Sequence, residues 1–292
     1  MIYSIRLTIT HHYDQPAANS RHVIRVLPRQ LAGRQNLLLH NIHVMPQPDA
    51  RTDSTDFFRT ATQDCAHLAA HLTMTLQLAC QVEVLPPAPW LDMSPDLATL
   101  GAQWAACRDL DADAPVHFLG AAQQLSIDRR IRDFALGVFD PADSAAQTVM
   151  RLGQALHYTM TFDSTATTVE TDAAEAFALR RGVCQDFSHI MILGLRALGI
   201  PAGYVSGYLR TLPPPGGVKL AGADAMHAWV RAWCGTSHGW IEYDPTNATL
   251  VGTDHIVVGY GRDYADVAPL RGQLRVAGGQ RNTQAVDVTV LR

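Results

Sequence analysis

The segment Arg181–His189, RGVCQDFSH, constrains the fold more than any other part of the chain. Gly182 breaks one helical stretch, and after Cys184 the apolar residues of Phe187–Leu198 recur at helical spacing until Gly199 stops them. One face of this helix is therefore expected to be buried. That leaves Cys184 in the first helical turn, where unpaired backbone N–H groups and the positive end of the helix dipole favour a thiolate.

A cysteine at that place can act as a nucleophile if a base and an orienting acid reach it. Two later stretches offer candidates, His227 in MHAWV and Asp244 in WIEYDPT. If the strands around them are antiparallel neighbours, side chains on one face lie about 5 Å apart, and His227 and Asp244 can meet. Spacing alone is weak support, because the chain has 13 histidines.

Composition narrows the function classes. The chain has 292 residues, enough for two domains, and its 23 basic and 27 acidic residues give a net charge of −4. Without a run of lysine or arginine, neither nucleic acid nor a membrane is an expected partner. The N-terminus lacks a signal peptide's apolar stretch and no run reaches about 18 apolar residues, so we expect a cytoplasmic protein. Five scattered cysteines without CxxC spacing argue against disulfides or structural zinc.

Residues 1–88 are predicted to form an antiparallel β-sandwich. Tyr3–Ile9 alternates apolar and polar side chains, and further strands are expected over 22–27, 37–44 and 72–84. A turn-rich gap, Asp14–Ser20, separates the first two. The histidines of this region lack the spacing of a metal site, and we expect them to be solvated or packed. Prolines between 86 and 89 mark the boundary with a second domain, 89–292.

The second domain is predicted to be α+β, with helices first and an antiparallel sheet after them. Helices are expected over 96–105 and 128–136 and from residue 144 onward. A capping box at Asp172–Glu175 opens a short helix that Gly182 ends. Strands follow over 202–209, 225–233 and 239–243, and an alternating strand over 286–290 closes the chain. The nucleophile-bearing helix is expected to pack on this sheet.

Short sequence blocks link the chain to a known family. In chain order they are Gly182–His189, Ala197–Ala202, Tyr204–Leu209, His227–Trp229, Gly239–Trp240 and Asp244–Asn247. Together they resemble the bacterial transglutaminase-like cysteine peptidase family. The tail (His255–Ile256, Gly261–Gly272) and the N-terminal region (Tyr13, Pro16, Leu27–Arg29) extend the likeness to nearly the whole chain. The resemblance implies a papain-like, transglutaminase-like core with Cys184 as nucleophile, His227 as general base and acid, and Asp244 as orienter, and it implies no cofactor and no metal.

Residues beside these blocks are further candidates for the cleft. They are Asp186, His189, Trp229, Trp240, Arg262 and Tyr264. For Asp186 and His189 the favoured interpretation is that they anchor the helix to its neighbours. The two tryptophans either wall an acyl pocket or pack in the core, which is the usual place of tryptophan. Arg262 and Tyr264 belong to the block Gly261–Gly272. Both positions for this block, beside the cleft or away from it, are open.

We therefore expect a cysteine enzyme that opens an amide of a peptide or protein through a thioester, with hydrolysis preferred over transfer to an amine. One alternative is transglutaminase-type transfer on glutamine side chains, because the same acyl-enzyme serves both reactions. Another is a catalytically silent peptide-binding module. A metal site of Cys184, Asp186 and His189 is disfavoured, because residues five apart do not stack on a helix. No acidic loop suggests calcium regulation, and no heptad or exposed apolar helix indicates an oligomeric state.

Overall fold

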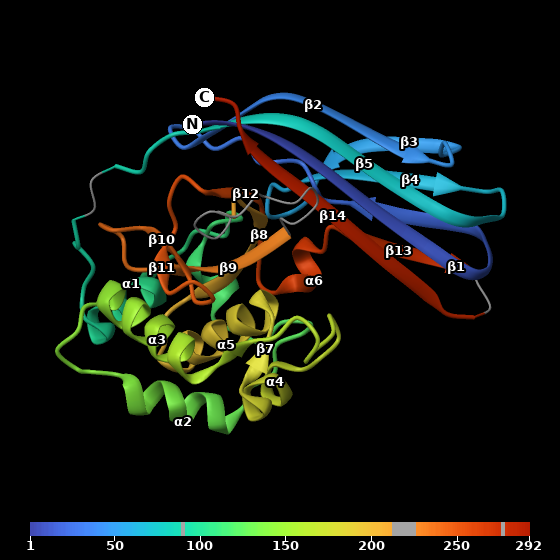
Figure 1. Cartoon of the computed structure of the whole chain (residues 1–292). Coiled ribbons are helices and arrows are strands. Elements are labelled where there is room, and N and C mark those ends of the chain that lie inside the picture. The colour runs from blue at the N-terminus through green and yellow to red at the C-terminus, as the bar shows by residue number, and fades with distance from the viewer. Residues whose placement is uncertain (89–90, 212–225, 276–277) are drawn as a thin grey trace, which may run out of the picture.

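The computed structural model describes residues 1–88, 91–211, 226–275 and 278–292. A curled antiparallel sheet lies over a mixed core of helices and a second sheet (Figure 1). The curled sheet is seven-stranded: β1 (Ile2–Ile24), β2 (Gln35–Met45), β3 (Ala50–Thr55), β4 (Ala61–His67), β5 (His71–Val84), β13 (Leu270–Arg275) and β14 (Gln280–Val290). Its order is β2-β5-β1-β4-β3, and β13 and β14 both pair with β1.

Strand β1 corrects one expectation, since the gap predicted at Asp14–Ser20 is part of a continuous strand. Its first half pairs with β5 and β14, and its second half with β4 and β13. The register shifts between His12 and Ala17 and again between Ala18 and Arg21. Such irregularities bend a strand without ending it. The predicted sandwich is therefore one sheet that curls around β1.

The last two strands return to this first sheet. Val286 and Val288 of β14 are buried in the same core as Tyr3 and Ile5 of β1. The first sheet is thus completed by residues far beyond position 88. That a second domain with the helical segment begins after residue 88 stays a prediction.

The second part of the chain combines helices with a five-stranded antiparallel sheet. The helices are α1 (Leu97–Ala106), α2 (Arg129–Val138), α3 (Ala145–Thr159), α4 (Ala173–Leu179), α5 (Cys184–Ala197) and α6 (Tyr264–Val267), with a 3-10 turn at Pro115–Phe118. The sheet order is β11-β10-β9-β8-β12, from β8 (Ala202–Leu209), β9 (Met226–Trp233), β10 (Trp240–Asp244), β11 (Thr249–Leu250) and β12 (His255–Gly261). Short strands β6 (Thr161–Phe162) and β7 (Arg181–Gly182) pair in parallel.

Helix starts lie where the sequence predicts them. Asp96, Asp128 and Asp172 each accept a backbone N–H in the first turn of their helix, and Ser144 forms a capping box at the start of α3. The end of α4 differs from the prediction. It ends at Leu179, before Gly182, because Arg180 adopts a left-handed conformation with φ 55°.

Helix α5 is the central helix of this second part. Every residue from Gln185 to Leu195 is buried, since β8 and β9 cover one side of the helix and α2, α3 and α4 the other. Gly199, at φ +81°, follows its C-terminus as predicted. A helix enclosed on all sides offers a rigid base for its first residue, Cys184.

Strand β12 fixes the two sheets to each other. Ile256 and Val258 are buried in the core of the first sheet, and the Gln35 side chain makes two 2.8 Å hydrogen bonds to the backbone of Val257. The five-stranded sheet is therefore docked on the first sheet through both apolar and polar contacts. Among the described residues, no helix is long and apolar enough to cross a membrane.

Candidate active site

The start of α5 is held by Asp186. Its Oδ2 accepts the Val183 N–H at 2.8 Å and the Thr167 hydroxyl at 2.6 Å. Burial raises the pKa of this carboxyl, and the two hydrogen bonds act in the opposite direction. A Cβ on Gly182 would lie 2.5 Å from Asp186 Oδ2, so glycine is needed for this close approach. Asp186 thus has the geometry of the anchor that the sequence favours, and it fixes the turn that carries Cys184.

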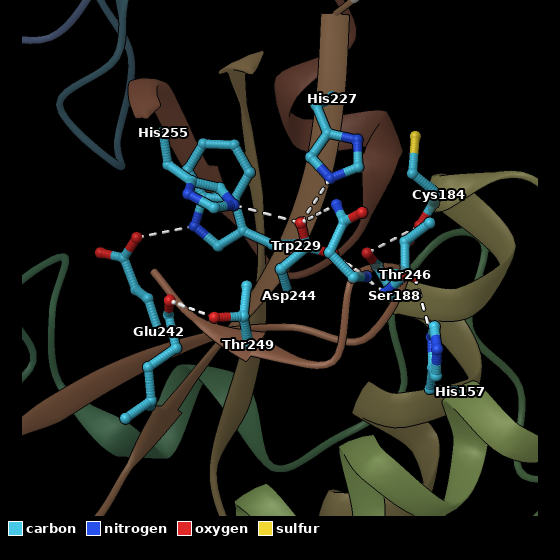
Figure 2. A network of polar contacts seen from close by, with 12 residues as sticks. His157, Cys184, Ser188, His227, Trp229, Glu242, Asp244, Thr246, Thr249 and His255 are labelled. Atoms are coloured by element: carbon cyan, nitrogen blue, oxygen red, sulfur yellow. Dashed lines mark hydrogen bonds and ion pairs between the residues drawn. The ribbon is translucent and has the colours of Figure 1, made fainter. Parts of the chain in front are cut away.

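His227 lies between Cys184 and Asp244. Its Nε2 is 2.7 Å from Asp244 Oδ2, and Figure 2 shows the other ring nitrogen on the side of the Cys184 sulfur. Burial lowers the pKa of His227, but the charge of Cys184 and hydrogen bonds to Asp244 and Cys184 outweigh it and raise the pKa above its ordinary value. The structure therefore brings these three residues together, one each from α5, β9 and β10.

The Asp244 carboxylate is completely buried and fully surrounded by donors. Oδ1 accepts the N–H groups of Thr246 (2.9 Å) and Asn247 (3.2 Å). Oδ2 accepts the Asn247 side-chain amide at 2.7 Å and His255 Nε2 at 3.1 Å, besides His227. Burial alone would raise the pKa of Asp244, but these bonds hold it far below its usual range. His157 supports the same turn, since its Nδ1 donates to the Thr246 carbonyl at 2.9 Å.

His255 is a member of this network that sequence reasoning missed. The only signal for it is its place in the His255–Ile256 block, which carries no role. Three residues, His227, Asp244 and His255, each offer one atom that can bind a metal. These three atoms lie within 4.8 Å of one another, so the set could hold a metal ion in principle. Each of these atoms is already engaged in the hydrogen bonds between them, so an ion would have to displace both imidazole N–H groups. The donor set fits a hydrogen-bonded network better than a metal centre.

His189 is a core histidine. It is buried, its Nε2 accepts the Tyr264 N–H at 3.2 Å, and its ring packs 5.2 Å from that of Tyr204. Burial, with a further contribution from Arg196, lowers its pKa to about 3. His189 and Asp186 are thus bonded to different partners, and the geometry does not favour a metal site that joins them to Cys184.

The two tryptophans pack against neighbouring side chains, but only Trp229 is in the interior. Trp229 is fully buried, and its Nε1 donates to Glu242 at 2.7 Å. Trp240 is half-buried against Phe118, and its Nε1 donates to the Asp113 carbonyl at 3.1 Å. Trp229 borders His227, with its ring 6.2 Å from that of the histidine.

Arg262 and Tyr264 lie on the side of the first sheet. Arg262 is paired with Asp266 at 2.8 Å, and its guanidinium lies 5.7 Å above the Phe58 ring. Tyr264 lines a cavity of about 460 Å³ between the two halves, whose other walls include His11 and Glu170. Tyr264 thus borders a hollow, while Arg262 ties α6 to the first sheet.

Comparisons with known proteins agree with this architecture. Residues 132–245 match the Transglutaminase-like superfamily, and residues 3–83 match the Bacterial transglutaminase-like N-terminal region. An uncharacterized protein of Mycobacterium tuberculosis is 37% identical over 263 residues, which is 88% of this chain and 82% of that protein. A crystal structure from Cytophaga hutchinsonii, described as a "Putative Cysteine Protease", superposes with a TM-score of 0.76 at 22% identity, covering 100% of this chain and 91% of that one. A 71-residue stretch is 41% identical to the protein-glutamine gamma-glutamyltransferase of Pseudomonas aeruginosa, covering 24% of this chain and 10% of that protein.

Proposed function

Because this chain belongs to the transglutaminase-like superfamily, we propose that it is a cysteine-dependent amide-bond hydrolase acting on peptides or proteins through a thioester. The observation that carries the proposal is the line from Asp244 through His227 to Cys184 at the start of a buried helix. The same residue types in this order are those that cysteine nucleophiles need.

In the proposed acylation, His227 takes the proton from Cys184 Sγ, and the sulfur forms a bond to the substrate carbonyl carbon. The C–N bond then breaks, the imidazolium gives its proton to the leaving amine, and a thioester remains. In deacylation, His227 removes a proton from water, whose oxygen attacks the thioester. The carboxylic acid leaves, and the proton returns to Cys184.

Asp244 and the start of α5 support these steps. The carboxylate holds the proton of His227 on Nε2, so that Nδ1 is the nitrogen available to the sulfur. The backbone N–H of Cys184 belongs to the first turn of α5, whose amides lack acceptors within the helix. When the substrate carbonyl carbon is bonded to Cys184 Sγ, this N–H is the natural donor to the oxyanion on that carbon.

Acyl transfer to an amine is the second candidate. The short match to a glutamyltransferase of Pseudomonas aeruginosa favours it, and the thioester is common to both reactions. A site that excludes water and admits an amine transfers the acyl group, and one that admits water hydrolyses it. Incubation of a glutamine-bearing peptide with and without a primary amine separates them, with Cys184→Ala as the blank. We expect ammonia release without amine incorporation, and incorporation would make the protein a transferase.

Selective alkylation tests the nucleophile itself. At a pH near 6 we expect iodoacetamide to label Cys184 and not Cys65, Cys80 or Cys234, which are buried and whose thiol pKa values burial raises. Cys107 is partly exposed, so Cys107→Ser is the control that should leave labelling unchanged. His227→Ala should abolish the selectivity. Unchanged labelling in that variant would favour a catalytically silent binding module.

A further inference from the structure

The Asp244 carboxylate serves two imidazoles at once. His227 and His255 approach the same oxygen, Oδ2, at 2.7 and 3.1 Å. Figure 2 shows the two rings on either side of this oxygen, with only His227 next to the Cys184 sulfur. A triad needs one imidazole, so the second requires its own explanation.

His255 is placed to act only as a donor to Asp244. It is the first residue of β12, it is buried, and its Nδ1 has no hydrogen-bond partner in the part of the chain that the structure describes. An ionised carboxylate accepts hydrogen bonds, so the hydrogen of the His255 ring lies on Nε2. Each such bond makes the carboxylate less basic toward its other partners.

A contact with Trp229 holds the His255 ring in this orientation. Trp229 meets it edge to face, with ring centroids 5.2 Å apart and planes at 78°. The Trp229 indole is itself fixed by its hydrogen bond to Glu242, and Glu242 by a two-pronged ion pair with Arg34. The support for His255 therefore extends from the catalytic sheet to the first sheet.

We propose that His255 is a positioning residue that draws off part of the negative charge of Asp244 and thereby loosens the hold of His227 on its proton. The inference rests on the function proposed above. In that reaction the imidazolium must give its Nδ1 proton to the leaving amine, and it would hold that proton more strongly if Asp244 lacked the His255 donor. His255 acts through Asp244 and touches neither the sulfur nor the substrate.

The test is the pH profile of alkylation of Cys184 by iodoacetate, measured per titratable thiol. The anionic reagent is attracted by the imidazolium, so its rate falls at high pH as His227 loses its proton. In the part of the chain that the structure describes, the ionisable groups that face His227 are Cys184 from α5, Asp244 at the end of β10 and His255 from β12. We expect His255→Leu to move the high-pH limb upward by about one pH unit. His255→Gln, which keeps an N–H donor at a similar reach, should restore the wild-type limb.

The outcomes separate the inference from the proposed function. A wild-type profile without a high-pH limb, or one whose limb survives His227→Ala, contradicts the function and the inference together. If the limb depends on His227 but stays in place or moves downward in His255→Leu, only the inference is wrong. A His255→Gln variant that fails to restore the limb, with the thiol fully titratable, also overturns it, because shape and not the donor would then be responsible.

Discussion

Arg34 and Glu242, 208 positions apart in the chain, form a two-pronged ion pair that joins the turn before β2 of the first sheet to the five-stranded sheet. Arg34 Nη2 donates to Glu242 Oε2 at 2.8 Å, and Nη1 donates to Oε1. Glu242 also accepts hydrogen bonds from Trp229 and Tyr260. The ion pair lowers the pKa of this buried carboxyl against the effect of burial. The first sheet thereby supports the indole that backs His255.

Breaking this ion pair from one side should destabilise the protein. Arg34→Met leaves the Glu242 charge buried without its partner, and we expect a loss of about 3 kcal/mol in the free energy of unfolding by urea. The value is at the low end for buried pairs because the Arg34 side chain is 35% exposed. The double variant Arg34→Met, Glu242→Gln should recover most of the loss. A double variant as unstable as the single one would show that the charge is not the cause.

Asp244→Asn should nearly abolish turnover. The amide keeps the shape of the carboxyl but carries no charge. Its own N–H groups also face the hydrogen-bond donors that surround Asp244, so the tautomer of His227 is no longer fixed. We expect kcat to fall by about 10³–10⁴-fold. As a milder control, Asn247→Ala removes one donor to Asp244 and should cost about tenfold. A rate for Asp244→Asn within tenfold of the wild type would remove Asp244 from the mechanism.

Gly182→Ala should damage the turn that carries Cys184. The new Cβ would lie 2.5 Å from Asp186 Oδ2, so the carboxyl must move and its bond to the Val183 N–H is lost. We expect a loss of about 1–3 kcal/mol in unfolding free energy, together with slower alkylation of Cys184. The matched control is Gly137→Ala in α2, where a Cβ meets nothing within 4 Å and alanine favours the helix. Equal stability of the two variants would contradict the packing argument.

The stability of the first sheet should depend on pH through His22. Burial, and then the charges of neighbouring histidines, lower the pKa of His22 to about 4. The unfolded chain binds a proton near pH 6.5, which the folded state does not take up until about pH 4, so folding weakens as the pH falls through this interval. The cost reaches about 3 kcal/mol at the acid end. His22→Gln should show a smaller difference in urea midpoint between pH 7 and pH 4.5, and an unchanged difference would assign the effect to other groups.

The elements that the sequence predicts best are those set by local signals. Asp128 and Ser144 cap helices because their side chains satisfy amides only a few residues away. The continuity of β1 could not be predicted, since its polar middle is spanned by a few pairs with distant strands: Ala17 with His71 of β5, Ala18 with Arg275 of β13 and Ser20 with His67 of β4. Strand β12 was missed because all its residues are buried, so no alternation marks it.

The site shows the same division. Cys184, His227 and Asp244 could be proposed from residue type and from a family resemblance, and the structure places them side by side. His255 and Arg34 could not. The contact of His255 with Asp244 depends on the strand order of the five-stranded sheet, and that of Arg34 with Glu242 depends on how the two sheets dock. No periodicity or spacing in the sequence encodes that docking.

The pairing of β14 with β1 sets Tyr3 opposite Val290. During translation β1 is synthesised long before β14. The edge of β1 that pairs with β14 therefore stays unpaired until the end of the chain is made. The core of the first sheet, in which Val286 and Val288 of β14 lie with Ile256 and Val258 of β12, is complete only when that edge is paired. The surface on which the five-stranded sheet docks is therefore finished only after β14 has been made.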